Sequence, residues 1–376
     1  MSELLSQPRR RPYRPLSYWL QNSHLDGLLM LGLLALLTVS MVVLYSSGGE
    51  DIGLSIRQAV RMSIAFVVLF IAAQIHPDRL RDLAYWMYGF GLLLLIAVLL
   101  FGDIGKGAQR WLDLGFMRFQ PSEIMKIAVP LLVAAYLSER PLPPSFLRII
   151  TALVIIAIPT VLIAKQPDLG TAMLIASAGL VVIFLAGISW KLILSFVAIL
   201  AAAAPLLWFN MHGYQQRRVL TFLNPENDPL GAGYHIIQSK IAIGSGGLNG
   251  RGWLQGTQSH LEFLPERSTD FIFAVIGEEF GLIGVVLLIM LYLLITARGL
   301  FIASQAQTSF GSLLAGSIAI TFLVYVFVNI GMVTGLLPVV GVPLPLVSYG
   351  GTSMVTLLAG FGILMSIHTH RRMMSP

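Results

Sequence analysis

The chain has 376 residues, of which 56% are hydrophobic and only 11% are charged, and its mean hydropathy is +0.81. Soluble domains carry about 25% charged residues, so a water-soluble fold of this length is excluded and a bilayer must solvate most of the chain. The net charge of +6 fits basic residues that flank membrane helices and meet anionic lipid. We therefore expect no nucleic-acid partner, and the absence of cysteine excludes disulfides and thiolate metal sites.

The N-terminus carries four arginines, Arg9, Arg10, Arg11 and Arg14, followed by an apolar stretch from Leu28 to Tyr45. The apolar region of a signal peptide has about 7–15 residues and precedes a cleavage site with small residues. This stretch is longer and lacks such a site. It predicts an uncleaved first membrane helix that follows a basic cytoplasmic tail.

Apolar runs long enough to span a membrane recur along the whole chain, since a spanning helix needs about 20 residues. The second of them is the weakest, because Arg57 and Arg61 lie in its first turns, from which their side chains would have to snorkel to the interface. The sequence predicts an all-α integral membrane protein, a single polytopic domain over 1–376 with ten transmembrane helices, at 26–46, 57–75, 84–101, 122–138, 146–164, 170–188, 191–211, 270–297, 310–332 and 351–367.

Ten spans place both termini on one side, and the basic residues at both ends, including Arg371 and Arg372, indicate that this side is the cytoplasm. The largest loop, 212–269 between spans 7 and 8, is then on the outer side. Segment 333–350 contains too much Pro and Gly for a helix and is too apolar for a free loop. It predicts a re-entrant segment, because irregular backbone at membrane depth is tolerated where it is buried in protein or lines a cavity.

Two features stand out within the long outer loop. Residues 234–243 place apolar side chains at near-helical spacing, which predicts an interfacial helix. The Gly-rich run 244–252 lacks the Gly-Lys-Ser/Thr ending of a phosphate-binding P-loop. We therefore favour a flexible loop over a phosphate loop at this position.

Most of the 18 acidic residues fall on the predicted outer side, where Asp270 lies at the start of the eighth span. Ionisable groups at membrane depth are costly and are functional by default. Asp270 follows Ser268 and Thr269, and all three residue types are good helix N-caps. The local pattern therefore leaves two interpretations open for Asp270, a helix cap and a catalytic carboxylate.

Three further polar groups lie near predicted helix starts on the same side. Glu123 and Lys126 are three residues apart and share one helix face, as a surface ion pair or as a buried functional pair. Asp168 lies in a short turn between spans 5 and 6. Arg110 and Trp111 form either an interfacial anchor or a cation and an aromatic face for a sugar phosphate.

Four long stretches closely resemble the SEDS family, the shape, elongation, division and sporulation proteins. In chain order they are GAQRWLDLGFMRFQPSEIMKIA (107–128), AKQPDLGTA (164–172), GTQSHLEFLPERSTDFIFAVIGEEFGLIG (256–284) and NIGMVTGLLPVVGVPLPLVSYGGTS (329–353). Their order and spacing extend the resemblance over nearly the whole chain. The details of the last two stretches and the short tails resemble the elongation branch of the family more than the division branch.

This resemblance implies a peptidoglycan glycosyltransferase that polymerises lipid II, an undecaprenyl-diphosphate-linked disaccharide-pentapeptide, into β-1,4 glycan strands on the periplasmic side during cell elongation. Asp270 matches the essential acidic residue of the family. The candidate substrate-binding residues are the matched polar positions of the same cavity together with outer aromatic and cationic residues: Arg110, Trp111, Glu123, Lys126, Asp168, Lys240 and Arg267.

The chemistry implied by the resemblance needs a base near the acceptor hydroxyl and positive charge near the departing diphosphate. Transfer from an α-linked donor to a β-linked product is an inversion in one displacement, and we assign the base to Asp270. The seven histidines are scattered without a metal-binding motif. We expect no tightly bound cofactor and no dedicated metal site, although a divalent cation, Mg or Mn, is compatible with outer carboxylates and a substrate diphosphate.

Two other functions remain open at this stage, a lipid II transporter (flippase) and a non-catalytic scaffold of the elongation machinery. Buried charges and broken segments also occur in transporters, but here the polar residues gather on one side and no paired broken helices are detected. By resemblance, the protein is a multi-pass protein of the bacterial inner membrane. Its expected partners are a class B penicillin-binding protein and other membrane proteins of the elongation machinery.

Overall fold

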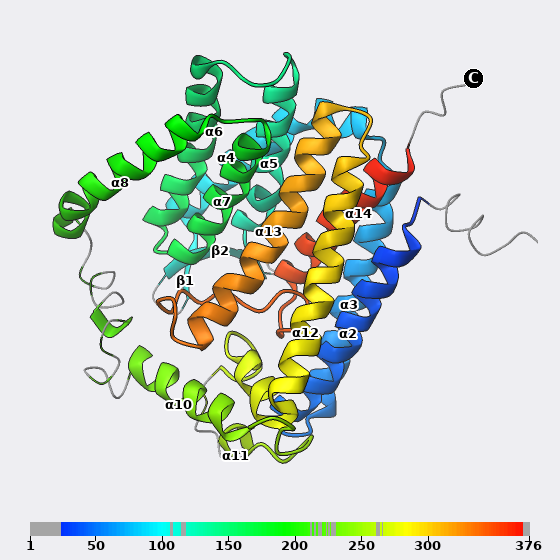
Figure 1. The fold of residues 1–376 in the computed structure, drawn as a ribbon, viewed down its shortest axis with the longest axis vertical. Helices are drawn as coiled ribbons and strands as arrows, with labels where there is room; N and C mark the ends of the chain where they lie inside the picture. Colours follow the sequence, from blue (N-terminus) through cyan, green and yellow to red (C-terminus); the bar gives the residue numbers. More distant parts are fainter. Residues whose placement is uncertain are drawn as a thin grey trace, which may run out of the picture.

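A computed structural model describes residues 24–105, 108–113, 118–210, 213, 216, 220–222, 224, 226, 231–260, 264 and 266–370 of the chain. The predicted basic N-terminal tail, Arg371 and Arg372 lie outside these residues, as does part of the predicted loop 212–269. In the described part the fold is helical apart from one small sheet (Figure 1).

Each of the ten predicted spans coincides with a helix. The helices are α2 (Gly27–Ser47), α3 (Ile52–Gln74), α4 (Pro77–Phe101), α5 (Ser122–Ser138), α6 (Phe146–Lys165), α7 (Leu169–Leu185), α8 (Trp190–Asn210), α12 (Ile272–Ser304), α13 (Ser309–Val333) and α14 (Thr352–Thr369). Among the described residues, seven helices are long and apolar enough to cross a membrane, namely α2, α3, α4, α6, α12, α13 and α14. Because α5 and α7 have only 17 residues each, the count of ten spans stays a prediction.

The helices α3 and α4 begin several residues before the predicted starts at 57 and 84, because polar capping residues set their ends. The carboxylate of Asp51 accepts a hydrogen bond from the Gly53 amide (2.7 Å) at the start of α3. At the start of α4, His76 Nδ1 accepts from the Asp78 amide (3.2 Å), and Pro77 occupies the first turn, where its missing N–H costs nothing. Apolar runs therefore locate these helices, and the caps that precede the runs define their first residues.

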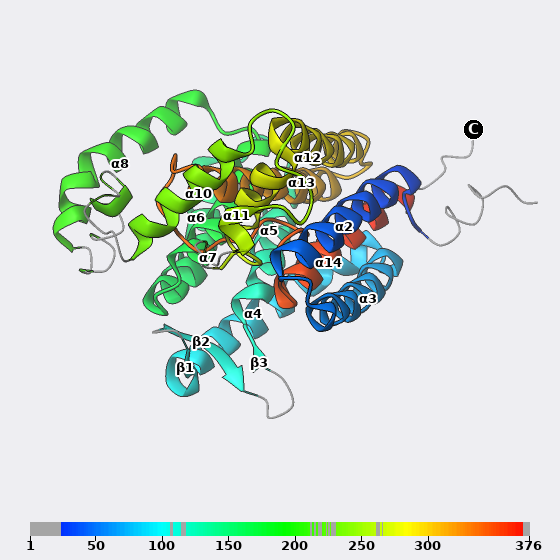
Figure 2. The same ribbon diagram turned by 90° about the horizontal axis from the view of Figure 1, so that it is seen from below.

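The segment between the predicted spans 84–101 and 122–138 contains a small sheet. Strands β1 (Asp103–Gly105), β2 (Ala108–Asp113) and β3 (Arg118–Phe119) pair antiparallel in that order. Aromatic and branched residues such as Trp111 and Phe119 favour extended backbone over helix. The sheet lies next to α4 and carries Arg110 and Trp111 on β2 (Figure 2).

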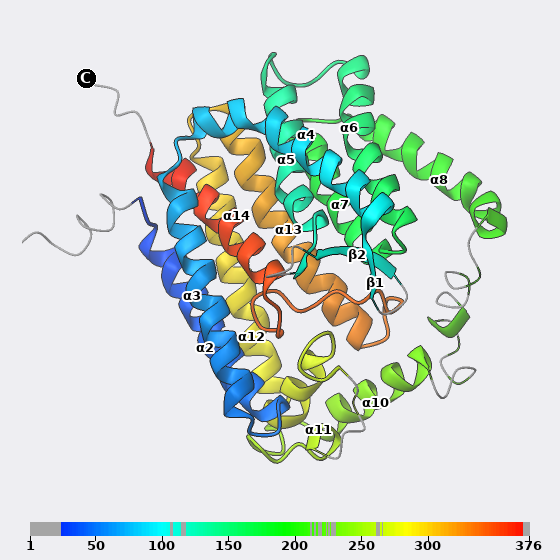
Figure 3. The ribbon, with the colours of Figure 1, turned by 180° about the vertical axis from the view of Figure 1, so that it is seen from behind.

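Apolar side chains cover much of the outside of the helix bundle. On α3, Ile64 and Val67 are 52% and 58% exposed, and on α4, Phe90 and Leu93 are 57% and 62% exposed. Continuous apolar surface of this kind is stable in hydrocarbon and aggregates in water. The fold is therefore that of a multi-pass membrane protein, and α3 packs along α14 inside it (Figure 3).

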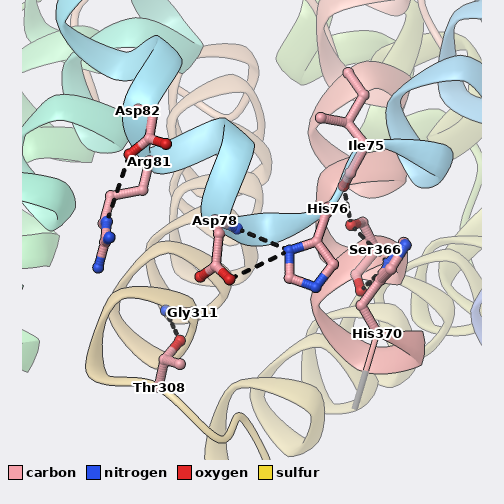
Figure 4. A network of polar contacts seen from close by, with 9 residues as sticks. All are labelled: Ile75, His76, Asp78, Arg81, Asp82, Thr308, Gly311, Ser366 and His370. Atoms are coloured by element: carbon pink, nitrogen blue, oxygen red, sulfur yellow. Dashed lines mark hydrogen bonds and ion pairs between the residues drawn. The ribbon is translucent and has the colours of Figure 1, made fainter. Parts of the chain in front are cut away.

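Three segments that are distant in sequence meet at one end of the bundle, which we call the terminal end. The ring of His24, just before α2, stacks on that of His370 after α14, with centroids 3.9 Å apart, and His76 meets His370 edge to face at 5.1 Å. Figure 4 shows His76 and His370 at this end, where the Ser366 hydroxyl donates to the carbonyl of Ile75. Residues 24, 76 and 370 thus share one end, so the end of α4 and the start of α5 lie toward the other.

The terminal end is expected to weaken in mild acid. Burial lowers the pKa of His370, the nearby His24 and His76 lower it further, and the Ser366 carbonyl opposes them in part. A lowered folded pKa means that the stabilisation is complete above the unfolded value of about 6.5 and is lost as pH falls through the folded pKa. The melting temperature in detergent should therefore fall between pH 7.5 and pH 5.5, and by less in His370→Asn. An equal fall in both proteins would contradict this account.

The Gly-rich run 244–252 packs against a break in α12. Gly281 has φ 63° and ψ −162° inside the helix, and the run forms hydrogen bonds with the backbone exposed by the break. Arg251 N donates to Glu278 O and Leu282 N donates to Gly247 O, both at 3.0 Å. The prediction of a flexible loop is wrong here, because the glycines permit a close backbone approach: a Cβ on Gly250 would lie 2.1 Å from Glu279 O.

Substitution of Gly281 tests the packing of the Gly-rich run against the break in α12, which we call the interlock. The conformation of Gly281 is available essentially to glycine alone, and a Cβ there would lie 2.3 Å from Gly250 N. Gly281→Ala is expected to lower the free energy of unfolding by about 1–3 kcal/mol, measured by thermal or chemical unfolding in detergent. Gly89→Ala in α4 is the control, because nothing lies within 4 Å of a Cβ there and Ala favours helix. Equal stability of the two variants would rule out the interlock.

The predicted helix at 234–243 is observed as α10 (Ala232–Ser245). Its buried positions include Gly233, Ile236, Ser239 and Ala242, which lie on one face by helical spacing. This face packs against α12 and α13, and the Ser239 hydroxyl donates to Val333 O at 2.7 Å. The buried apolar side chains of the predicted interfacial helix thus pack against α12 and α13. A short helix, α11 (Thr257–His260), follows α10.

Candidate active site

Asp270 lies in the turn before α12 and is partly buried. The N-cap of α12 is Phe271, which makes no side-chain cap hydrogen bond, so the interpretation of Asp270 as the helix cap is wrong. Its Oδ2 would lie 3.4 Å from a Cβ on Gly341, in the irregular segment between α13 and α14. A glycine at 341 therefore leaves space beside this carboxylate.

The backbone around Asp270 is bound at three consecutive carbonyl groups. The Tyr349 amide donates to Ser268 O (2.8 Å), the Ser348 hydroxyl to Thr269 O (2.5 Å), and the Asn329 side-chain amide to Asp270 O (2.8 Å). All three donors belong to the end of α13 or to the segment before α14. The turn that carries Asp270 is therefore attached to the segment before α14 at residues 268 and 269 and to α13 at residue 270.

Segment 334–351, which overlaps the predicted re-entrant segment 333–350, is irregular backbone, and its residues 344–348 are buried by protein. Ser40 of α2 donates to Val347 O (2.8 Å), and Tyr292 of α12 donates to Pro345 O (2.7 Å). Val347 and Leu344 are fully buried. Because side chains from several helices bind its carbonyls, this non-helical backbone is stable inside an apolar bundle.

Glu123 and Lys126 form a buried ion pair in the first turns of α5. Lys126 Nζ lies 2.7 Å from Glu123 Oε1, and the two side chains are 10% and 7% exposed. The ammonium also lies 5.5 Å from the ring centroid of Tyr325 on α13, within range of a cation–π contact. The surface-pair interpretation is therefore wrong, and a buried lysine ammonium stands inside the bundle.

Asp168 combines two roles at the start of α7. It is the N-cap, with its Oδ1 accepting from the Thr171 amide (3.3 Å), and its Oδ2 accepts from Gln120 Nε2 (3.1 Å). Arg110 Nε lies 3.8 Å from the same Oδ2, and the guanidinium donates to Pro167 O. One carboxylate thus caps α7 and pairs with Arg110, and the role of Asp168 in substrate binding stays a prediction.

Both halves of the candidate site are connected to residues 340–342. Gly170 on α7 approaches this segment so closely that a Cβ would lie 2.6 Å from Val340 O. Val342 packs with Leu174 and with Tyr325, the residue that covers Lys126, while Gly341 lies beside Asp270. Residues 340–342 thus contact Asp270 directly and are linked to Lys126 through Tyr325 and to Asp168 through the start of α7.

The remaining sequence-predicted residues occupy flanking positions. Trp111 is partly buried on β2, next to Arg110. Lys240 of α10 lies across Gly335, where a Cβ would meet its Nζ at 2.8 Å. Arg267 reaches the turn between α2 and α3, where its Nη2 would lie 3.8 Å from a Cβ on Gly49.

Two further residues near the site, Arg61 and Asn329, were not predicted as functional from the sequence. Arg61, expected to snorkel, places its guanidinium 4.2 Å above the ring of Tyr349, whereas Arg57 does reach the surface and pairs with Asp51 at 3.3 Å. Asn329, a fully buried amide on α13, binds the backbone of Asp270. A polar residue inside an apolar helix is the only sequence signal that distinguishes Asn329.

Comparisons with known proteins agree with this architecture. A family model for cell cycle proteins of the FtsW, RodA and SpoVE group matches residues 20–373. The chain belongs to this family. It is 58% identical over 360 residues to the peptidoglycan glycosyltransferase MrdB of Escherichia coli, covering 96% of this chain and 97% of MrdB.

Two solved structures extend the comparison to three dimensions. One, from work on the structural coordination of polymerization and crosslinking by a peptidoglycan synthase complex, superposes with a TM-score of 0.81 at 34% identity, covering 92% of this chain and 99% of the other. The rod shape determining protein RodA of Thermus thermophilus gives a TM-score of 0.69 at 31% identity, with 91% and 96% covered. The chain is thus a RodA-like member of the family.

Proposed function

We infer that the chain is a peptidoglycan glycosyltransferase that polymerises lipid II into glycan strands. The observation that carries this function is that a partly buried carboxylate, Asp270, lies beside Gly341, and that a buried ammonium, Lys126, is linked to the neighbouring Val342 through Tyr325. Inverting glycosyl transfer needs these two functions, a base and a positive charge near the leaving group. The name of the E. coli relative supports the same activity.

The reaction balances with the residues present. An Asp270 carboxylate oxygen takes the proton of the acceptor sugar hydroxyl. At the same time, the oxygen of that hydroxyl attacks the anomeric carbon of the donor. The bond from this carbon to the phosphate oxygen breaks, its electron pair leaves with undecaprenyl diphosphate, and the configuration inverts from α to β. Lys126 and Arg110 stabilise the charge that develops on the diphosphate.

The other site residues hold or orient these groups. Glu123 compensates the buried charge of Lys126 by direct pairing at 2.7 Å, and Asp168 pairs with Arg110 at 3.8 Å. Trp111 offers an aromatic face to a sugar ring. Lys240 and Arg267 add positive charge where the diphosphate enters and leaves.

An apolar cavity beside the site suits the lipid tail. It has a volume of about 140 Å³ and lies between α7, α13 and segment 334–351, lined in part by Met173, Leu174, Val324 and Leu337. Its lining also includes Gly170 and Val340, which border the polar residues. A polyprenyl chain bound there would bring its diphosphate toward Lys126 and Arg110.

A divalent cation, Mg or Mn, would act together with the substrate. Within the described ranges no group of three or more His, Asp or Glu is arranged to hold a metal ion. Diphosphate oxygens would therefore supply most of its ligands, with Asp270 or Asp168 as the protein's contribution. Its chemistry would be neutralisation of the leaving diphosphate.

We place the protein in the bacterial inner membrane, with both termini in the cytoplasm and the active site facing the periplasm. The site lies away from the terminal end, where residues 24 and 370 meet, and the basic tails favour a cytoplasmic location for that end. The partner is a class B penicillin-binding protein of the elongation machinery. The match to a subunit of a peptidoglycan synthase complex supports this assignment.

An assay in proteoliposomes separates this function from the transporter alternative. Purified protein, reconstituted with its partner and supplied with labelled lipid II, should yield long glycan that muramidase digests. The transporter interpretation instead predicts that lipid II crosses the vesicle membrane unchanged. Translocation without any polymer would overturn the glycosyltransferase assignment, and so would unchanged lipid II in both leaflets.

A further inference from the structure

Asn329 is a buried amide that joins two parts of the candidate site. It lies near the end of α13 and has no exposed surface. Its Nδ2 donates to Asp270 O at 2.8 Å and to Val342 O at 2.7 Å. A side-chain amide nitrogen carries two hydrogens, so both donors are used, and both bind backbone next to the site.

These two hydrogen bonds fix the surroundings of the Asp270 carboxylate. One holds the residue that carries the carboxylate, and the other holds the residue after Gly341, beside which Oδ2 lies. The two carbonyls belong to segments more than 70 positions apart in the chain, and one nitrogen sets the spacing between them. Loss of the Asn329 Nδ2 group is therefore expected to move the Asp270 carboxylate relative to residues 341 and 342.

The same helix face contacts the other half of the site. Tyr325 lies one turn before Asn329, and residues four apart on a helix are neighbours. Tyr325 covers the ammonium of Lys126. One turn of α13 therefore spaces the predicted base from the predicted cation.

The side-chain oxygen of Asn329 shows which part of the amide is needed. Oδ1 is buried and has no hydrogen-bond partner, which is unfavourable in a dry interior. An apolar side chain of similar size would avoid this cost and would pack in the same space. The two donors therefore account for an amide at this position.

We propose that Asn329 is a positioning residue for glycosyl transfer, which sets the distance and orientation of the Asp270 carboxylate through the backbone of residues 270 and 342. This proposal rests on the function proposed above. Catalytic groups must be held to within about 0.5 Å of their productive geometry, and a misplacement of about 1 Å can lower the rate about 10²-fold.

Gln58 of α3 provides a matched control. It is also a fully buried amide with an unpartnered oxygen, and its Nε2 donates to a carbonyl of the same segment, Ser348 O, at 3.4 Å. It makes no hydrogen bond to Asp270. Loss of a buried amide as such should affect both positions, whereas loss of positioning should affect Asn329 alone.

The experiment compares Asn329→Leu, the near-isosteric Asn329→Asp and Gln58→Leu with the wild type, as full chains with the partner and lipid II. We expect kcat to fall about 10²-fold in both Asn329 variants with KM little changed, and to stay near the wild-type value in Gln58→Leu. Melting temperatures identify any variant that fails to fold. If Asn329→Leu fails to fold, the comparison rests on Asn329→Asp. Retention of wild-type kcat in the folded Asn329 variants, or an equal loss in Gln58→Leu, would overturn the proposal.

A second measurement does not depend on activity. Hydrogen exchange of the peptide that contains residues 266–274 should quicken in the Asn329 variants and not in Gln58→Leu, because of these two amides Asn329 is the one that binds the carbonyl of Asp270. Unchanged exchange would reject the positioning role, even if the wild type made no glycan. Absence of glycan from the wild type together with quickened exchange would overturn the proposed function and leave Asn329 as an anchor of this turn.

Discussion

Replacement of Asp270 by Asn is expected to lower kcat for glycan polymerisation by about 10²–10⁴-fold, the usual contribution of a positioned acid or base. Asparagine is nearly the same size as aspartate, but its amide cannot take the proton of the acceptor hydroxyl. The turn should keep its shape, because Asn329 binds the backbone carbonyl of Asp270, which the substitution leaves in place. We therefore expect KM for lipid II and the melting temperature to change little.

The measurement is steady-state polymerisation of labelled lipid II by purified proteins of verified melting temperature. Asp82→Asn is the control, since the Asp82 side chain is 78% exposed and lies in α4 near the terminal end. Its kcat should equal that of the wild type. A kcat of Asp270→Asn within a factor of about three of the control would remove Asp270 from the role of base.

Replacement of Lys126 by Met is expected to damage both stability and activity. The substitution leaves the carboxylate of Glu123 buried without its cation, and breaking a buried ion pair in this way costs about 3–5 kcal/mol. It also removes the positive charge assigned to the departing diphosphate. The melting temperature should fall strongly, and little polymer should form.

The double variant Glu123→Gln with Lys126→Met separates the two effects. Removal of both charges relieves the uncompensated burial, and replacement of whole buried pairs is often neutral for stability. We expect the melting temperature to recover while polymerisation stays low. Full polymerisation activity in the double variant would show that the pair serves the fold alone. An unchanged melting temperature in Lys126→Met would contradict the claim that Glu123 is left buried without its cation.

The sequence allowed the membrane helices to be predicted from local signals, whereas the candidate site residues were proposed from local patterns together with the resemblance to the SEDS family. Apolar runs located each helix, and the spacing of Glu123 and Lys126 placed them on one helix face before any contact was known. The starts of α3 and α4 were missed because Asp51 and His76, which cap them, precede the apolar runs.

The contacts that assemble the site are of a different kind and could not be predicted. Asn329 binds a carbonyl 59 residues away, and Ser348 binds one 79 residues away, so neither leaves a periodic pattern. The stacking of Arg61 on Tyr349 and the docking of the Gly-rich run on α12 likewise depend on tertiary packing. The cap interpretation of Asp270 stayed open for the same reason, since only the backbone geometry shows that α12 begins after it.

The most direct test of the proposed function compares wild type and Asp270→Asn in one polymerisation reaction with the class B penicillin-binding partner and labelled lipid II. Both proteins should bind lipid II with similar affinity. The account predicts muramidase-sensitive glycan from the wild type and almost none from Asp270→Asn. Polymer from both proteins would contradict the assignment of Asp270, and absence of polymer from the wild type would contradict the glycosyltransferase itself.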